Sequence, residues 1–335
     1  MPKKDHRSPQ KRQTRGPRPA GISWPMQASC GLVMITAGLL AWLGAPRLIA
    51  WRSAPDSEGG TDQIQAIHGD DLYQPSVGQD GKNVIWVPTQ DDLMQAMLEA
   101  LNIQPDDILY DLGSGDGKIV INAAQQYNIN AVGIEYDPQL VELAKRNAAR
   151  AGVEDQTTFV RGDIFQEDFS NASAVALYLL PELNLKLKPT ILSMRPGTRV
   201  VSNTFDMGTW PADTTIELDR STRAYYWVVP ARVQGRWQLE DSTNNTVGEL
   251  DLRQEFQLVG GEVVINGEVF TILSGRMEGE AITFTYGHRT ANGDRSHGSF
   301  QGTVRADRLQ GTLNKQAKQQ QLTGRLRASQ RQGLT

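Results

Sequence analysis

Between residues 87 and 205, short apolar runs alternate with longer segments whose apolar residues recur every three or four positions. The longer segments, 87–103, 117–127, 138–152 and 181–194, predict helices, with Thr89 as the N-cap of the first. Strands that alternate with helices at this spacing predict an α/β fold with a parallel, doubly wound sheet. The predicted strands are DILYDL (107–112), NAVGIEYD (130–137), TTFVRGDIF (157–165), SAVALYLL (173–180) and GTRVVSNTF (197–205), and TTIELDR (214–220) and RAYYWVVPA (223–231) predict a closing antiparallel pair.

The pattern changes after residue 230. Apolar and polar residues alternate from there to residue 326, and Gly or Asn interrupts them at short intervals. This pattern predicts a separate β-meander domain over 231–326, either a small sandwich or a barrel-like sheet. Residues 327–335 are predicted to form a solvated tail.

The N-terminal part has a different character. An uncharged window runs from Pro19 to Pro46, after a segment with seven Lys or Arg residues and one acid. As a helix, its apolar centre (28–45) would span about 27 Å, close to the thickness of a bilayer core. We expect a basic segment (1–27), a transmembrane anchor (28–51) and a linker (52–82). A cleaved signal peptide, a transit segment or a buried helix are the alternatives to the anchor, and a loop ordered around Tyr73 is the alternative to the linker.

Composition narrows the chemistry. The single cysteine, Cys30, excludes an intramolecular disulfide and a cysteine-based zinc site, and the four histidines lack metal-ligand spacing. The formal net charge of −4 gives no global attraction to nucleic acid. The sequence therefore predicts neither a metal site nor a nucleic-acid partner.

The stretch DLGSGDG (111–117) joins the first predicted strand to the helix after it. In a doubly wound sheet, ligands bind at the carboxyl ends of the strands. Gly113, Gly115 and Gly117 permit positive φ, so a ligand can lie directly on the backbone. Glu135 ends the next strand, where a carboxylate can hold both ribose hydroxyls. The pocket is therefore predicted to take an adenosine-like ligand.

Further acids indicate which ligand. The spacing is G-x-G-x-G rather than the G-x-G-x-x-G of dinucleotide sites, and Asp111 and Asp116 would repel a pyrophosphate. The same carboxylates favour a ligand with an ammonium and a sulfonium. Asp163 is placed to accept from an adenine amino group, with Ile164 against the ring. The predicted cofactor is S-adenosyl-L-methionine.

These motifs carry a family resemblance. DLGSGDG, GIEYDP and GDIF resemble the motifs of class I, seven-stranded methyltransferases. More narrowly, VPT, YDLGSGDGKIVI, LLPELNLKLKP and GTRVVSNTFDMGTW resemble the mitochondrial protein-lysine methyltransferases of the ATP synthase c-subunit and the adenine nucleotide translocase, and their bacterial relatives. The resemblance covers about residues 83–212. It implies a methyltransferase domain, here bounded at 83–230, a protein substrate, and a hydrophobic segment ahead of the catalytic domain. The long C-terminal extension departs from the family.

The resemblance also suggests roles for single residues. Tyr178 and Glu182 stand where methyltransferases place substrate-facing residues, and are the catalytic candidates. As structural residues they would be a core aromatic and a helix N-terminal charge, and Pro88 with Thr89 could be only a helix start. The Asn-Pro-Pro motif of amide and nucleobase amine methylation is absent. The predicted cofactor-binding residues are Pro88, Thr89, Asp111, Gly113, Ser114, Gly115, Asp116, Gly117, Glu135, Asp163 and Ile164.

Three functions fit the sequence: a membrane-anchored protein-lysine methyltransferase, a small-molecule methyltransferase with the β-domain as its lid, and a cofactor-binding assembly module without turnover. A narrow apolar acceptor pocket would favour lysine, a wide cavity capped by the β-domain would favour a small molecule, and a blocked pocket would favour the module. A lysine nucleophile must be neutral, which burial promotes, so no catalytic base is required.

The charge distribution and the need for a cofactor predict opposite sides of the membrane for the catalytic domain. The basic residues before the apolar window exceed Arg47 and Arg52 after it, which places the N-terminus inside and the catalytic domain outside. The predicted cofactor is charged and is made in the cytosol. We expect the catalytic domain on the cytoplasmic side, where the cofactor is available.

Overall fold

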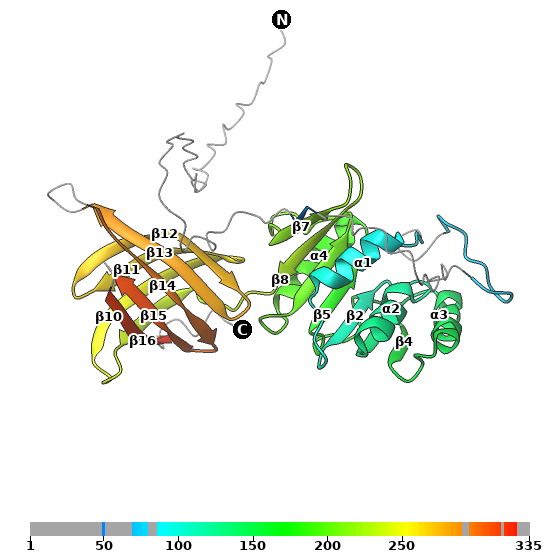
Figure 1. Ribbon diagram of the computed structural model, residues 1–335, viewed down its shortest axis with the longest axis horizontal. Coiled ribbons are helices and arrows are strands. Elements are labelled where there is room, and N and C mark those ends of the chain that lie inside the picture. Colours follow the sequence, from blue (N-terminus) through cyan, green and yellow to red (C-terminus); the bar gives the residue numbers. More distant parts are fainter. Residues whose placement is uncertain (1–48, 51–68, 80–85, 290–294, 316–317, 327–335) are drawn as a thin grey trace, which may run out of the picture. The chain divides into compact units, whose positions relative to one another are not determined.

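The structure is a computed structural model that describes residues 49–50, 69–79, 86–289, 295–315 and 318–326 (Figure 1). It contains a mixed α/β sheet and a closed β-barrel. The helices are α1 (Asp91–Ala100), α2 (Lys118–Tyr127), α3 (Pro138–Ala151) and α4 (Pro181–Leu192). The strands of the sheet are β1 (Ile49–Ala50), β2 (Ile108–Leu112), β3 (Asn130–Glu135), β4 (Thr157–Arg161), β5 (Ala174–Leu177), β6 (Arg199–Asn203), β7 (Thr214–Glu217) and β8 (Arg223–Val228). Those of the barrel are β9 (Gly235–Glu240), β10 (Thr246–Glu255), β11 (Leu258–Ile265), β12 (Glu268–Glu278), β13 (Ala281–Arg289), β14 (Arg295–Arg305), β15 (Arg308–Lys315) and β16 (Lys318–Leu326).

The α/β sheet has the strand order β1-β7-β8-β6-β5-β2-β3-β4. Strands β6, β5, β2, β3 and β4 are parallel, whereas β8 runs antiparallel to both β6 and β7. The Rossmann-like sheet and its closing antiparallel pair are therefore confirmed, and the sheet as a whole is mixed.

Helices cover both faces of this sheet. Alternate residues of β2 point to opposite faces, as the period of a strand requires. Leu109 joins the apolar cluster that contains α1, α2 and α3, while Tyr110 and Leu112 join the cluster that contains α4. This double covering leaves the carboxyl ends of the strands, where the chain turns into helices, as the place for a ligand.

Two local expectations were wrong. Gln90, not Thr89, is the N-cap of α1, and Thr89 is buried. The third predicted strand ends at Arg161, because the chain turns at Gly162 and the Asp163 carbonyl accepts hydrogen bonds from the backbone of Gln166 and Glu167. Both corrections move residues out of regular elements and into the edge of the ligand pocket.

The predicted anchor lies outside the described residues, except for its last part. Ile49 and Ala50 form β1, which pairs in parallel with Ile216 and Glu217 of β7, so a helix does not continue through them as the 28–51 bounds require. Among the residues that the structure describes, no helix is both long and apolar enough to cross a bilayer. The basic segment 1–27 and the tail 327–335 also lie outside the described residues.

Part of the expected linker, residues 69–79, is an ordered loop on the catalytic domain. Asp70 forms an ion pair with Arg146 of α3, with 2.5 Å between Oδ2 and Nε. Tyr73 packs against the cluster of Trp86, Leu140 and Leu143. The alternative interpretation of this segment, an ordered loop around Tyr73, is the correct one for these residues.

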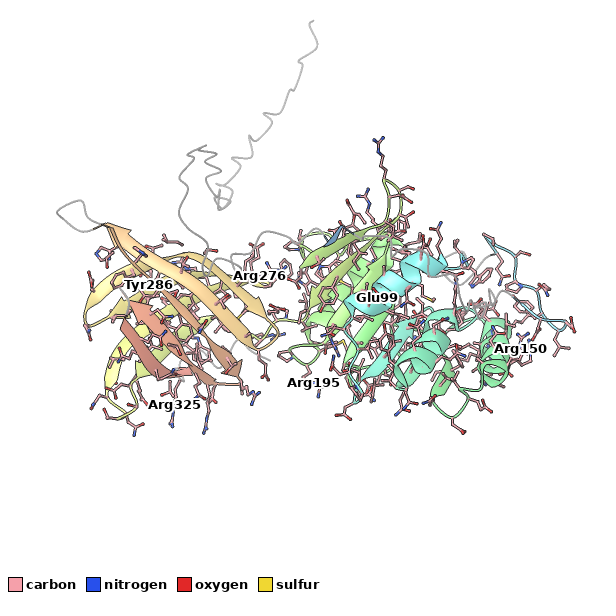
Figure 2. All side chains as sticks on the ribbon, viewed as in Figure 1. Glu99, Arg150, Arg195, Arg276, Tyr286 and Arg325 are labelled. Atoms are coloured by element: carbon pink, nitrogen blue, oxygen red, sulfur yellow. The ribbon has the colours of Figure 1, made fainter. Side chains whose placement is uncertain are left out.

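The C-terminal meander closes into an eight-stranded antiparallel barrel with the order β10-β11-β12-β13-β14-β15-β16-β9. Trp237, Phe270, Phe284, Tyr286 and Phe300 are buried in its interior, whereas Arg325 on β16 is exposed (Figure 2). The rings of Phe284 and Phe300 stack at 5.0 Å. The interior is therefore a packed core, as expected of a barrel of this size.

Side-chain contacts join the barrel to the loop between β6 and β7. The Trp210 Nε1–H donates to Gln257 Oε1 at 3.0 Å, and Gln257 Nε2 donates to the Pro211 carbonyl at 2.6 Å. Arg276 of β12 forms an ion pair with Asp213 just before β7. Gln257 thus satisfies an indole N–H that is fully buried, a group that is costly to leave unpaired.

Candidate active site

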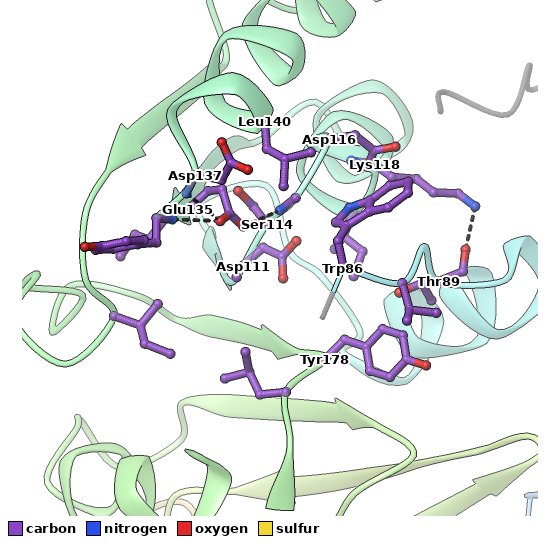
Figure 3. Close-up of a pocket in the computed structure, with 18 of the residues that line it drawn as sticks. Trp86, Thr89, Asp111, Ser114, Asp116, Lys118, Glu135, Asp137, Leu140 and Tyr178 are labelled. Carbon is purple, nitrogen blue, oxygen red and sulfur yellow. Dashed lines mark hydrogen bonds between the residues drawn. The ribbon is translucent and has the colours of Figure 1, made fainter. Parts of the chain in front are cut away.

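A pocket opens at the carboxyl ends of β2, β3, β4 and β5 (Figure 3). Its walls are the glycine turn after β2, residues 135–137 at the end of β3, residues 162–165 after β4, residues 178–179 after β5, and the segment 86–89. All of its lining residues lie between Gln79 and Leu183, so none of the described barrel residues contributes. The pocket is the place at which the topology predicts a ligand.

The glycine turn has the backbone that the sequence predicts. Gly113, Gly115 and Gly117 have φ of 86°, 53° and 85°, in the left-handed region. A Cβ atom on Gly115 would lie 2.6 Å from Nε1 of Trp86, and one on Gly113 would lie 2.9 Å from a methyl carbon of Leu179. Close packing therefore adds to the conformational reason for glycine.

The three glycines do not have one role. Gly113 and Gly115 line the pocket, as does Ser114, whose N–H donates to the Ile134 carbonyl at 3.1 Å. Gly117 is instead the N-cap of α2, where a Cβ would clash with Phe159, and it does not line the pocket.

Glu135 is fixed at the end of β3 by backbone donors. Its carboxylate accepts hydrogen bonds from the N–H groups of Gly115 at 3.0 Å, Tyr136 at 2.8 Å and Asp137 at 2.9 Å. These bonds tie the glycine turn to the second strand. They also orient the carboxylate at the pocket wall, where it can accept from ligand hydroxyls.

Two acids are buried beside the turn. Asp111 is 3% exposed, and burial together with the nearby charges of Glu135 and Asp116 raises its pKa to about 8. Burial raises the pKa of Asp116 to about 7, although Lys118 opposes this effect. Both line the pocket. A cationic ligand group beside Asp111 would favour its ionised form.

The residues after β4 form another wall of the pocket. Asp163, Ile164 and Phe165 all line the pocket, and Asp163 Oδ1 accepts from the Phe165 N–H at 3.1 Å. Leu140 of α3 contributes another apolar wall. A flat, aromatic ligand fits between such side chains.

Tyr178, Pro88 and Thr89 also line the pocket. In Figure 3, Tyr178, Thr89 and Trp86 lie on the side of Asp111 away from Glu135. Glu182 is different: it is exposed in the first turn of α4 and does not line the pocket. The structure thus brings Tyr178 to the predicted site, and it places Glu182 as a helix N-terminal charge.

Sequence reasoning missed Lys118 and Trp86. Lys118 is 6% exposed, its Nζ donates to the Thr89 carbonyl at 2.6 Å, and it forms an ion pair with Asp91. This lysine holds the segment 86–89 against the glycine turn. Its place directly after the glycines was a signal, but a partner nearly thirty residues upstream is not visible in a local pattern.

The residues present fit S-adenosyl-L-methionine. Asp111 and Asp116 can supply negative charge once an ammonium or a sulfonium lies beside them, Glu135 can accept from ribose hydroxyls, and Ile164 with Leu140 can enclose an adenine. A pyrophosphate fits poorly, because two carboxylates lie beside the turn that would have to hold it.

Comparison with known proteins agrees with this chemistry. The family model for the ANTKMT methyltransferase domain matches residues 111–214. A protein-lysine N-methyltransferase of Saccharolobus islandicus is 38% identical over 139 residues, which are 41% of this chain and 86% of the archaeal protein.

Two mouse enzymes match over shorter lengths. The lysine N-methyltransferase of the ATP synthase c-subunit is 36% identical over 32% of this chain, and that of the adenine nucleotide translocase is 37% identical over 30% of it. This chain spans 43% and 45% of their lengths. Among solved structures, a Salinibacter ruber RNA methyltransferase in complex with S-adenosyl-L-homocysteine is 47% identical, covers 44% of this chain and 96% of its own, and has a TM-score of 0.43.

Proposed function

We propose that this chain, which belongs to the S-adenosylmethionine-dependent protein-lysine N-methyltransferases, methylates a lysine of a protein that lies in or next to a membrane. The cofactor, when bound, supplies an electrophilic methyl group. The protein's own residues orient that group, receive the lysine and exclude water.

The observation that carries the choice of a lysine is the construction of the pocket. Its walls beyond Asp111 include the aromatic side chain of Tyr178, and all of the described lining residues come from the catalytic domain. Apolar walls disfavour an ammonium, so they promote the neutral amine that must attack the methyl carbon. Alignment in a dry site can supply most of the rate, with effective molarities of about 10⁵–10⁸ M in model reactions.

A small-molecule acceptor receives less support. That function requires the barrel to act as a lid, but no described residue of 231–326 lines the pocket. The barrel instead contacts the loop after β6 through Gln257 and Arg276.

Methyl transfer is tested with the full chain, methyl-labelled cofactor, and separate membrane, soluble-protein and RNA fractions. We expect label in a protein of the membrane fraction, on lysine after digestion and mass analysis. Glu135→Ala, which removes a pocket-wall carboxylate, is the matched control and should transfer less label at a subsaturating concentration of the cofactor. Label in RNA or in a small molecule, with none on lysine, would contradict the proposal.

Membrane association rests on the uncharged window from Pro19 to Pro46. We propose that this window is a single-pass anchor, with the catalytic domain on the cytoplasmic side. Deletion of residues 1–52 should release the protein from membranes and leave cofactor binding intact, since the pocket lining begins at Gln79. A deletion variant that still sediments with membranes would refute the anchor. Protease digestion of the C-terminal domain in intact spheroplasts would refute the sidedness.

A further inference from the structure

Trp86 precedes residues 111–214, which the family model matches, and yet it lines the pocket. It is 9% exposed, and its Nε1 lies 2.6 Å from the position a Cβ on Gly115 would take. The indole therefore lies against the central glycine of the turn. It also packs against Leu140 and Leu143 of α3.

Residues 69–79, here called the strap, hold this tryptophan from the N-terminal side. The Gly78 N–H donates to the Trp86 carbonyl at 2.8 Å, and the Trp86 N–H donates to the Gln79 carbonyl at 3.0 Å. Gln79 lines the pocket, and its side-chain Nε2 donates to the Tyr73 hydroxyl at 2.8 Å. Backbone and side-chain contacts thus connect Trp86 to Tyr73.

The far end of the strap is clamped on α3 by a charge pair. Asp70 Oδ1 accepts from the N–H groups of Leu72 at 3.0 Å and Tyr73 at 2.8 Å, which fixes a tight turn. Its Oδ2 accepts from Arg146 Nε at 2.5 Å. The Arg146 guanidinium lowers the pKa of Asp70 to about 2, so the pair stays charged across the ordinary pH range.

We propose that Trp86 is a cofactor-binding residue and that the strap, clamped by Asp70 and Arg146, holds it against the glycine turn. The inference rests on the cofactor site and not on the identity of the methyl acceptor. It follows that the segment between the N-terminal part and the catalytic domain forms a wall of the site, and that the cofactor exchanges more freely when the strap is released.

The first test titrates the full chain with S-adenosyl-L-homocysteine by calorimetry. Trp86→Ala should weaken binding about tenfold or more, because it removes a buried aromatic wall. Trp86→Phe retains a ring and should weaken it less. The change in tryptophan fluorescence on binding should disappear in Trp86→Phe, since the other described tryptophans, 210, 227 and 237, do not line the pocket.

The second test separates the clamp from the pocket. Asp70→Asn should increase hydrogen exchange in residues 69–79, because a partly buried ion pair is lost. It should also weaken the binding of S-adenosyl-L-homocysteine by about threefold or more. Lys145→Ala is the matched control: it removes a cation from the same helix, but Lys145 pairs with the exposed Glu142. Arg146→Met should add little to Asp70→Asn in the double variant.

Each half of the inference has its own contrary outcome. Wild-type affinity in a folded Trp86→Ala protein, or an unchanged fluorescence response in Trp86→Phe, would exclude Trp86 from the cofactor site. Unchanged exchange and affinity in Asp70→Asn would exclude the clamp. Neither outcome depends on which substrate is methylated, so the proposed lysine activity would stand.

Discussion

Asp111→Asn should change how the stability of the cofactor-free protein depends on pH. The Asp111 carboxyl group is 3% exposed, and its pKa is raised to about 8 by burial and by the nearby charges of Glu135 and Asp116. In the unfolded chain the same group ionises near its ordinary value of about 4. The folded state therefore binds the extra proton between these two values. The stability that this proton contributes is fully present below the pKa of the unfolded chain. It is lost as the pH rises through the pKa of the folded protein.

The size of the effect follows from this difference in proton binding. Each pH unit over which the folded state holds one more proton changes the free energy of unfolding by about 1.4 kcal/mol. Between about pH 6 and pH 8 the folded carboxyl goes from nearly full to half protonation, so the wild type should lose about 2 kcal/mol relative to the asparagine variant. Asp116 is present in both proteins, so only the part of its titration that is coupled to Asp111 enters the comparison.

Thermal unfolding of both proteins, followed by the far-ultraviolet helix signal, measures this difference. All four described helices, from Asp91 to Leu192, lie in the catalytic domain, so the barrel contributes little to the signal. Asp155→Asn, at an exposed position, is the control. Parallel pH profiles for wild type and Asp111→Asn would refute the reasoning, as would a wild type whose relative stability rises with pH. Calorimetry in two buffers should also detect a proton released from wild type, but not from the variant, when the cofactor's cationic group binds.

Three further changes have expected outcomes. Glu135→Ala should weaken the binding of S-adenosyl-L-homocysteine by about 1.5–3 kcal/mol, because a charged hydrogen-bond acceptor is lost. A wild-type affinity measured by calorimetry would contradict this expectation. Lys118→Met should destabilise the catalytic domain by about 1–3 kcal/mol in thermal unfolding, since the bond to the Thr89 carbonyl is lost, and Lys118→Arg should restore part of it. Gln257→Leu should lower the free energy of unfolding by about 1–3 kcal/mol, because the buried Trp210 indole N–H loses its acceptor. An unchanged melting temperature would show that another acceptor replaces Gln257.

Much of the catalytic fold can be predicted from local patterns. Apolar runs predicted β2 to β6, and helical spacing predicted α1 to α4, because each element buries one face or both. Pro138 and the left-handed Gly152 mark the ends of α3, as expected of its sequence. The glycine turn and Glu135 were predictable for a similar reason: the carboxyl ends of adjacent parallel strands necessarily meet.

Other features depend on contacts between distant residues. Alternation predicted the strands of the C-terminal domain and left a sandwich and a barrel open. The choice was made by pairing β9 with β16, the first strand with the last, and no local pattern carries that pairing. Likewise, the sequence placed Tyr178 and Glu182 side by side as candidates. In the folded protein Tyr178 lines the pocket, whereas Glu182 is exposed.

The amino-acid sequence by itself thus determined the class of fold, the cofactor and the carboxylates beside the glycine turn, because these depend on periodicity and on residues within one strand-turn-helix unit. Only the tertiary structure decided that Trp86 and Lys118 line the pocket and that residues 69–79 pack on α3. It also decided that no described barrel residue lines the pocket. The physical reason is that ion pairs, buried hydrogen bonds and ring packing join segments whose separation along the chain is not written in any local pattern. The free energy of these contacts is realised only when the whole domain is folded.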